Sequence, residues 1–444
     1  MKTLIKNAKI VNQGKIIEGD ILIENELISS IGEHLDFTNV DIIIDAKGNY
    51  VIPGAIDDQV HFREPGLTHK ANIETESKAA IAGGITSFIE MPNTNPQTTT
   101  LEELNKKFDR ALETSYANYS FMFGGTNDNL DEILKVNPKD VAGLKLFLGS
   151  STGNMLVDDP EVLERIFAST DMVISVHCED EATIKKNTAH YKTIYGDDIP
   201  VKYHPIIRSE EACYLSSSKA IELAKKTGAR LHVFHLSTGK ETHLFDNAIP
   251  LKDKKITAEV CIHHLWFSDK DYDEKGTHIK WNPAVKTSDD RAQLWEALLD
   301  DRIDVIATDH APHTLEEKAN VYTKAPSGGP LVQHAMVALF EAYHNGKISI
   351  EKIVEKTAHN PAILFDVEKR GYIKEGYYAD LVIVDANAPW TVAKDNILYK
   401  CGWSPFEGTT FKSKITHTIV NGSLVYNNDQ LTGVKAGKRL TFNR

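Results

Sequence analysis

Cysteine is scarce in this sequence. It occurs four times, as Cys178, Cys213, Cys261 and Cys401, and no two of these stand in a C-x-x-C spacing. A disulfide framework or a zinc ribbon needs closely paired cysteines, so neither is expected. With hydrophobic residues at 41% of the chain, an ordinary buried core can stabilise the fold instead.

Long apolar runs are also missing. No stretch approaches the roughly 18 consecutive apolar residues of a membrane span. The opening MKTLIKNAKIVNQG has no long apolar segment of the kind found in a signal peptide. We therefore expect no membrane association and a cytoplasmic location.

Positive charge is in deficit. The chain has 50 Lys and Arg against 63 Asp and Glu, which gives a formal charge of −13. This balance argues against an extended surface for nucleic acid but leaves room for a local cationic pocket that binds a small anion. The length, 444 residues, is enough for two or three domains at about 150 residues each.

Both ends of the chain have the sequence pattern of short β-strands separated by turns. DILIENELISSIG near the start and ADLVIVD and THTIVNG near the end are typical of antiparallel strands. The pattern between them is different. We predict a small β-sandwich domain composed of residues 1–52 and 360–444, and a separate domain over residues 53–359.

The middle of the chain alternates between strand and helix patterns. Helical segments are predicted at 70–82, 216–227 and 289–299, the last capped by Ser288. Strands are predicted at 55–61, 85–91, 119–124, 143–148, 172–177, 230–236, 256–263 and 303–309. Eight strands alternating with helices over about 300 residues predict an α/β fold of the (β/α)8 TIM-barrel type.

Residues able to bind metal recur where the predicted barrel strands end: His61, Lys145, His177, His235 and Asp309. Taken singly, each has an ordinary structural explanation, such as a hydrogen-bonded histidine, a snorkelling lysine or an aspartate that starts a turn. Five strands placing such residues at one face of a barrel make coincidence a poor explanation. We therefore predict a site for zinc or a similar divalent ion.

A lysine among metal ligands needs its own explanation, because an ammonium group would repel the cation. Burial favours the neutral amine, which can take up CO2 and become an anionic carbamate. On this hypothesis Lys145, in the run GLKLFL, would bridge two metal ions.

Three further polar residues follow the strand ends. Arg63 in HFREPG would direct a guanidinium into the same barrel mouth and favour an anionic substrate, unless it pairs with Glu64 or another acid. Asn93 in EMPNTNP offers an amide donor, although asparagine before a turn is commonplace. His313 in DHAPH is a candidate ligand or substrate contact.

The order of motifs resembles that of the dihydroorotases, cyclic amidohydrolases of the metal-dependent amidohydrolase superfamily. The motifs are HFREPG, MPNTNP, GLKLFLGSSTG, VHCED, HVFHLS, WNPAVKTSDDR and ATDHAPHTLEEK. The resemblance implies reversible cyclisation of N-carbamoyl-L-aspartate to L-dihydroorotate in pyrimidine synthesis. It also makes a homo-oligomer, either a dimer or a higher assembly, an expectation.

The resemblance also implies a role for each matching residue. His61 and Asp309 would bind one zinc ion, His177 and His235 a second, and Lys145, N6-carboxylated, would bridge them. Asp309 would also act as the catalytic base. Residues 149–155 lie where some members have a lid, and Ser151 and Thr152 would be its polar contacts. The substrate would be held by Arg63, Asn93, Asn282 and His313.

One position departs from the family pattern. Gln59 stands where the family's D-x-H-x-H motif has its first histidine, and an amide oxygen is a weaker ligand than imidazole. We therefore expect a depleted or altered first metal site and one firmly bound metal. Alternation along the strand predicts that Asp57, rather than Asp58, shares a side with Gln59 and His61 and could compensate.

Two rival hypotheses stay open at this point. A hydantoinase- or allantoinase-like cyclic amidase would keep the fold and change the substrate, and Arg63 argues against it. A non-catalytic scaffold for another pyrimidine enzyme, such as the carbamoyltransferase, is supported only by Gln59. The retained metal-ligand set argues against the scaffold.

Overall fold

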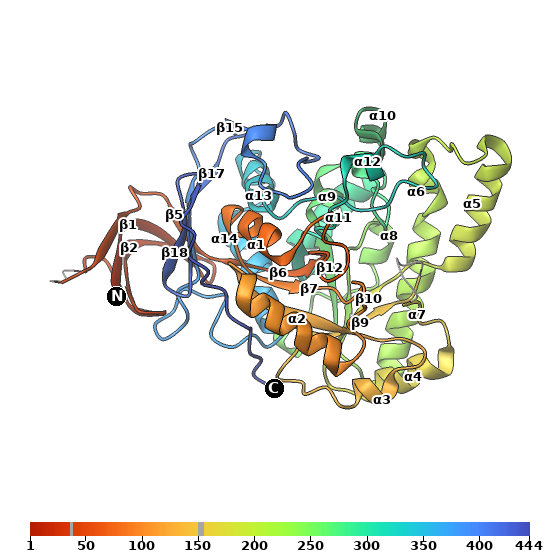
Figure 1. Ribbon diagram of the computed structural model, residues 1–444, viewed down its shortest axis with the longest axis horizontal. Coiled ribbons are helices and arrows are strands. Elements are labelled where there is room, and N and C mark those ends of the chain that lie inside the picture. The colour runs from red at the N-terminus through yellow and green to blue at the C-terminus, as the bar shows by residue number, and fades with distance from the viewer. Residues whose placement is uncertain (36–38, 150–154) are drawn as a thin grey trace.

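Eight parallel strands form the barrel at the centre of the computed structural model, which describes residues 1–35, 39–149 and 155–444 (Figure 1). Each strand pairs with the next in chain order. The strands are β6 (Ala55–Val60), β7 (Ile85–Glu90), β8 (Asn118–Gly124), β9 (Gly143–Phe147), β10 (Val173–His177), β11 (Leu231–Val233), β12 (Ile256–Cys261) and β13 (Val305–Ala307). The predicted (β/α)8 barrel is confirmed.

The first and last barrel strands meet just past their carboxyl ends. Val60 forms a parallel bridge with His310, and the His61 amide donates to the His310 carbonyl at 2.7 Å. Three predicted strands were too long. The segment 256–263 turns into a helix at Ile262, and the predicted strand 230–236 covers only Leu231–Val233. The last strand covers only Val305–Ala307, so that Asp309 lies in the loop beyond it.

Strands from both ends of the chain form the second sheet. Its order is β19-β18-β17-β14-β5-β1-β2-β3, with β4 also paired to β1. The Asn421-Gly422 pair connects β17 to β18. The strands are β1 (Lys2–Asn12), β2 (Lys15–Glu24), β3 (Leu27–Gly32), β4 (Ile42–Asp45), β5 (Tyr50–Pro53), β14 (Leu381–Asp385), β17 (Lys414–Val420), β18 (Ser423–Asn427) and β19 (Gln430–Leu431). A separate pair consists of β15 (Trp390–Thr391) and β16 (Thr410–Phe411).

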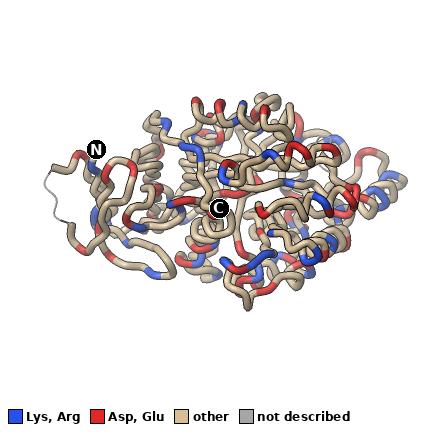
Figure 2. The backbone as a smooth tube through the Cα atoms, turned by 90° about the horizontal axis from the view of Figure 1, so that it is seen from below, with Lys and Arg blue, Asp and Glu red and all other residues tan. Residues whose placement is uncertain are grey.

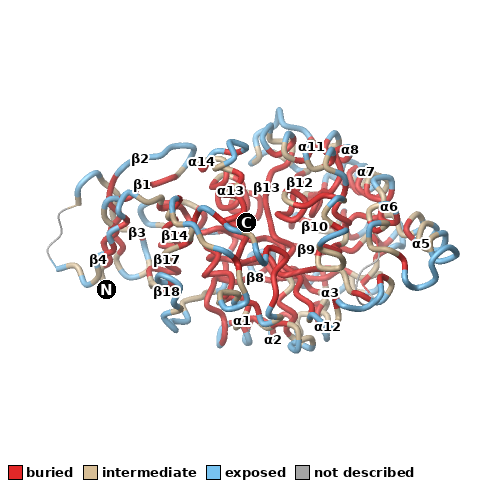
Figure 3. The backbone as a smooth tube through the Cα atoms, turned by 90° about the horizontal axis from the view of Figure 1, so that it is seen from above, coloured by how far each residue is buried: buried red, intermediate tan, exposed pale blue. Residues whose placement is uncertain are grey.

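Helices surround the barrel and cover its strands (Figures 1 and 3). They are α1 (Ile73–Ala82), α2 (Leu101–Thr114), α3 (Leu130–Ile133), α4 (Pro160–Ala168), α5 (Glu181–Tyr195), α6 (His204–Ile207), α7 (Glu210–Thr227), α8 (Gly239–Thr242), α9 (Ile262–Trp266), α10 (Tyr272–Lys275), α11 (Ser288–Leu299), α12 (Leu315–Lys318), α13 (Ala335–His344), α14 (Ile350–Val354) and α15 (Asn360–Leu364). The cap of α11 is Thr287 rather than the predicted Ser288, because Thr287 and Asp290 form a reciprocal capping box.

The floor of the barrel is apolar. Ile56 and Phe234 pack there against Phe365, which follows α15, and against Leu440 and Phe442 near the C-terminus. The last segment is fastened beside β8, where the Tyr119 amide donates to Lys438 and Tyr119 accepts from Leu440. Closing this end leaves the opposite end of the barrel, where the strands finish, as the open mouth.

Acidic and basic residues are interspersed along the chain rather than gathered in one region (Figure 2). This distribution agrees with the expectation that the chain has no extended basic surface. Among the described residues, no helix combines the length and apolar character needed to cross a membrane.

Candidate metal-dependent active site

A cavity of about 100 Å³ opens at the carboxyl ends of the barrel strands. The structure gathers in it every predicted site residue that it describes. Ser151 and Thr152, the predicted lid contacts, lie outside the described residues. The cavity is lined by Gln59, His61, Arg63, Asn93, Lys145, Phe147, His177, His235, Trp281, Asn282, Asp309, Ala311, His313, Ser327 and Gly328.

His177, at the end of β10, and His235, just past β11, face each other. His177 Nδ1 lies 3.1 Å from His235 Nε2, and burial lowers the pKa of both rings, which favours neutral imidazoles. Two nitrogens bound to one tetrahedral zinc ion at about 2.1 Å are separated by about 3.4 Å. The observed separation therefore suits two ligands of a shared metal ion.

Glu179 contacts His177 at the ring nitrogen that faces away from His235. This residue was not predicted from the sequence. Glu179 Oε2 lies 3.1 Å from His177 Nε2 and also pairs with Arg208. Burial would raise the pKa of Glu179, but Arg208 and His177 lower it to about 2. A permanent carboxylate beside Nε2 favours the tautomer that carries its proton on this nitrogen, which leaves Nδ1 available to a metal. The signal was its place in VHCED, two residues after His177.

His61 is arranged in the same way at the other wall of the cavity. Its Nδ1 lies 2.8 Å from Asn93 Oδ1, so the ring nitrogen donates to the amide oxygen. Its Nε2 then faces Asp309 Oδ1 at 3.2 Å. Burial lowers the pKa of His61, which again favours a neutral ligand. Asn93 therefore positions His61, a contact that the sequence did not suggest.

Lys145 lies between the two walls and is completely buried. Its Nζ lies 4.1 Å from the centre of the Phe234 ring and 4.9 Å from that of Phe147, and has no hydrogen-bond partner among the described residues. Burial lowers its pKa to about 7. A large fraction of neutral amine is therefore present near neutral pH.

Gln59 lines the cavity, but neither Asp57 nor Asp58 does. The expectation that Asp57 shares a side with Gln59 and His61 was wrong. The pairing of β6 with β7 is irregular between Asp57 and Val60, which breaks the alternation. Asp57 accepts from the Thr308 amide at 3.1 Å and from its hydroxyl at 2.6 Å.

The Gln59 side chain instead contacts Cys261, at the end of β12, which is buried and does not itself line the cavity. Its Sγ lies 3.8 Å from Gln59 Oε1 and 3.3 Å from Glu259 Oε1. Burial raises the pKa of this thiol well above its usual value. Composition alone could not connect a lone cysteine to this site, because 202 residues separate it from Gln59.

Arg63 is buried at the cavity mouth. Its Nε donates to the Pro312 carbonyl at 3.1 Å, and one terminal nitrogen lies 3.1 Å from His313 Nε2. The alternative that Arg63 pairs with Glu64 was wrong, because Glu64 binds Arg110 at 2.7 Å and accepts from the Ile73 amide at the start of α1. Burial lowers the pKa of Arg63 to about 10, which leaves it charged at neutral pH.

His313 lies between Arg63 at the cavity mouth and a second charged residue, Lys70. Its Nδ1 lies 3.0 Å from Lys70 Nζ, and its Nε2 lies 3.0 Å from the Ser327 carbonyl. Lys70 in turn pairs with Glu317 at 3.0 Å. Lys70 thus adds a second cation behind Arg63, which the sequence analysis missed because it stands in a loop, seven residues after Arg63.

Three cavity residues have a left-handed backbone although none is glycine. Their φ angles are 67° at Arg63, 43° at His235 and 48° at Asp309. Such angles cost about 1–3 kcal/mol each and persist where the surrounding structure holds them. The backbone is therefore strained at positions that bring polar side chains into one cavity.

Comparison with known proteins agrees with this geometry. The model of the amidohydrolase family matches residues 50–425. A dihydroorotase of Halobacterium salinarum is 34% identical over 96% of this chain and 98% of its own length. One of Pyrococcus abyssi is 32% identical over 98% of each chain, and one of Staphylococcus epidermidis 32% identical over 96% of this chain and all of its own.

Two solved structures with this fold are named as hydantoinases or dihydropyrimidinases rather than dihydroorotases. The L-hydantoinase (dihydropyrimidinase) of Arthrobacter aurescens superposes with a TM-score of 0.94 at 27% identity and covers 99% of each chain. The dihydropyrimidinase of Brevibacillus agri gives 0.91 at 27% identity over the full length of both chains.

Proposed function

The chain belongs to the amidohydrolase family and, within it, to the dihydroorotases, and we propose that it interconverts N-carbamoyl-L-aspartate and L-dihydroorotate, a step of pyrimidine synthesis. The observation that carries the proposal is Arg63. A buried guanidinium opens into the same cavity as the histidine and aspartate set, so one pocket offers both metal ligands and a binding group for a carboxylate.

The donor set fits a metal cofactor. Two neutral imidazoles face each other at 3.1 Å, and a third faces the Asp309 carboxylate at 3.2 Å. We assign the metal as zinc: His61 and Asp309 would hold one ion, His177 and His235 a second, and a carboxylated Lys145 would be a further ligand. In support, Lys145 is buried, its pKa lies near 7, and its amine lacks a partner in the described part of the chain. Gln59 offers one oxygen in place of the missing imidazole, so the ion beside it is held less firmly.

The metal and the Asp309 carboxylate would have separate roles in the reaction. When bound, the metal would polarise the ring carbonyl and lower the pKa of the attacking water. Asp309 accepts the proton of that water and later delivers it to the departing ring nitrogen, acting first as base and then as acid. In the reverse direction the same carboxylate removes a proton from the carbamoyl nitrogen. Ring closure is favoured at lower pH because it consumes a proton together with the open dicarboxylate.

Substrate orientation comes from the mouth of the cavity. Arg63 is held by the Pro312 carbonyl, so its guanidinium is fixed before the substrate arrives. Asn282 lines the cavity with a buried Oδ1 that lacks a hydrogen-bond partner within the described ranges. We assign Arg63, Asn93, Asn282 and His313 to the substrate.

The hydantoinase alternative is weaker. The solved structures that share the fold are 27% identical, whereas the dihydroorotases are 32–34% identical over nearly the whole chain. A neutral hydantoin ring would also leave the buried Arg63 without an anionic partner. A non-catalytic scaffold would not need the metal-ligand set that the cavity retains. Domain boundaries at residues 52 and 360, a homo-oligomeric assembly and a cytoplasmic location remain predictions.

A substrate panel tests the proposal. The zinc-loaded protein should open the L-dihydroorotate ring with a kcat/KM at least about 100-fold above those for hydantoin and allantoin, as the loss of one buried charge pair predicts. Faster turnover of hydantoin would transfer the chain to the alternative. No turnover of any of the three, in protein with confirmed metal content, would support the scaffold.

A further inference from the structure

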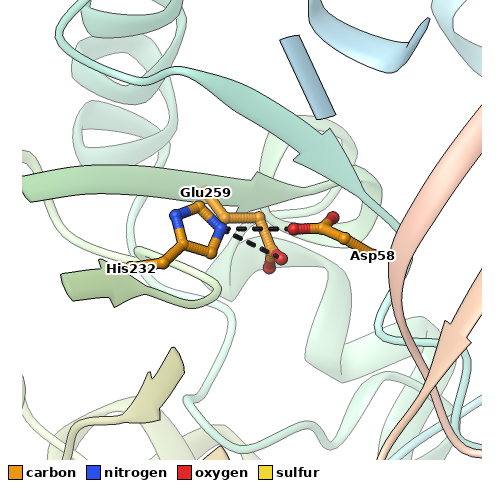
Figure 4. A group of neighbouring side chains, drawn as sticks. All are labelled: Asp58, His232 and Glu259. Carbon is orange, nitrogen blue, oxygen red and sulfur yellow. Dashed lines mark ion pairs between the residues drawn. The ribbon is translucent and has the colours of Figure 1, made fainter. Parts of the chain in front are cut away.

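A second group of metal-ligand side chains lies outside the cavity lining (Figure 4). Asp58 of β6, His232 of β11 and Glu259 of β12 converge there, and each is 0% exposed. His232 Nε2 lies 3.2 Å from Asp58 Oδ2 and 3.9 Å from Glu259 Oε2. Asp58 and His232 precede the cavity residues Gln59 and His235 along the chain, and β12 contributes no residue to the cavity lining. We call this group the inner triad.

Thr257 is the other neighbour of His232. Its hydroxyl lies 2.8 Å from His232 Nδ1 and 3.2 Å from the Leu231 carbonyl, and it has one hydrogen to donate to one of them. When the hydroxyl donates to Leu231, His232 Nδ1 carries the imidazole proton. In a neutral ring, Nε2 then presents its lone pair to the two carboxylates.

This arrangement is unfavourable without a positive group in it. His232 Nε2, both oxygens of Asp58 and Glu259 Oε2 are buried and have no hydrogen bond within the described ranges of the chain. The rings of Phe234 and Phe365 lie 5.3 Å and 5.8 Å from the imidazole, so the surroundings are apolar. Buried carboxylates normally find donors or a cation, because an unpaired buried charge costs several kcal/mol.

We propose that the inner triad binds a divalent transition-metal ion of the zinc type, separate from the ions of the cavity. One atom from each side chain lies within 4.8 Å of the others. Two ligand atoms about 2.1 Å from one tetrahedral zinc ion are about 3.4 Å apart, and His232 Nε2 lies 3.2 Å and 3.9 Å from the two carboxylate oxygens, so the separations are close to those of shared ligands. Two carboxylates neutralise the ion. The Nδ1 proton bound to Thr257 is the outer hydrogen bond that metal-binding histidines typically make.

A neutral Glu259 is the alternative to a metal ion, because burial and the neighbouring Asp58 raise its pKa well above the usual range. A proton on Glu259 would still leave Asp58 without an aligned hydrogen bond, since its 3.2 Å contact with His232 does not have hydrogen-bond geometry. A divalent ion would bind both side chains.

Glu259 connects the inner triad to the cavity. Its other oxygen, Oε1, accepts from the His235 amide at 2.9 Å and lies 3.3 Å from Cys261 Sγ. An ion on Oε2 would therefore fix a carboxylate that holds the left-handed backbone of His235. A zinc count of two per chain would then not by itself mean that Gln59 serves as a ligand.

Variants of the full chain separate the two sites. The cavity variant His61→Asn/His177→Asn/His235→Asn removes all three cavity imidazoles, and adding His232→Gln removes the inner nitrogen as well. After incubation with zinc chloride and dialysis, the cavity variant should retain about one zinc per chain by mass spectrometry, and the variant that also carries His232→Gln should retain about one less. A folded cavity variant that binds no zinc, or an equal zinc content in both variants, would overturn the proposal. Circular dichroism establishes folding, and neither result depends on the substrate.

Crystals of the unaltered chain grown with zinc provide a measurement that needs no variant. Anomalous diffraction at the zinc edge should give a peak between Asp58, His232 and Glu259. Peaks confined to the cavity would refute the inner site. Loss of dihydroorotate turnover alone would bear on the proposed function and not on this site.

Discussion

Arg63→Lys tests the assignment of the cavity mouth most sharply. The substitution keeps the charge but removes the planar fork that can bind a carboxylate with two parallel hydrogen bonds. It also removes the bond of 3.1 Å from Nε to the Pro312 carbonyl, which fixes the direction of the side chain. The loss of one charged hydrogen bond together with this orientation is worth about 2–3 kcal/mol.

This energy corresponds to a rise in KM for dihydroorotate of about 30- to 150-fold, with kcat changed less than about threefold, because the guanidinium positions the substrate and does not transfer the proton. The inhibition constant of dihydrouracil, the ring without the carboxylate, should change less than about threefold. Burial lowers the pKa of Arg63 only to about 10, so the KM effect should be constant between about pH 7 and 8.5.

Arg110→Lys is the matched control. Arg110 is a half-exposed arginine that binds Glu64, the residue directly after Arg63, and it does not line the cavity. Its replacement should leave KM within about twofold. Steady-state kinetics of both variants on both ring compounds give the answer. Equal losses for dihydroorotate and dihydrouracil would mean that Arg63 supports the loop and does not bind the carboxylate.

Three further outcomes follow from the cavity. Asp309→Asn should lower kcat by about 1000-fold or more while bound zinc falls less than twofold, and near-normal turnover would remove Asp309 as the proton carrier. Glu179→Gln should weaken zinc binding by about 10- to 100-fold in competition with a chelator, because Glu179 Oε2 no longer fixes His177 from 3.1 Å, and unchanged affinity would contradict this role. Since burial lowers the pKa of Lys145 to about 7 and only the neutral amine takes up CO2, bicarbonate-dependent zinc loading of the metal-free protein should rise with pH and reach half its maximum near that value. A midpoint near pH 10 would show an ordinary lysine.

The barrel could be predicted from the sequence because its strands are short apolar runs that finish on polar residues. His177 and Asp309 attracted notice for the same reason that they share a cavity: the strand ends of a parallel barrel meet at one face. Local patterns located each strand to within a few residues. Their exact ends depend on contacts distant in sequence, as where Ile262 begins a helix within the predicted strand 256–263.

The wrong placement of Asp57 and the failure to predict several site residues have identifiable physical causes. Asp57 was placed by strict alternation, and the irregular pairing beside it moved it to Thr308. Glu179 stands two residues after His177, a spacing that could have identified it, whereas Cys261 contacts Gln59 only in the folded chain, 202 residues apart. The inner triad escaped for the same reason. Its three residues come from β6, β11 and β12, and no pair stands in a recognised metal-binding motif.

Ring closure by the purified protein is the most direct test of the central claim. With N-carbamoyl-L-aspartate at about pH 6, where proton consumption favours the ring, the zinc-loaded chain should form L-dihydroorotate. A chelator should abolish the activity, and zinc with bicarbonate should restore it. Failure to close this ring, in protein that carries metal and opens hydantoin, would contradict the assignment of this cavity to dihydroorotate.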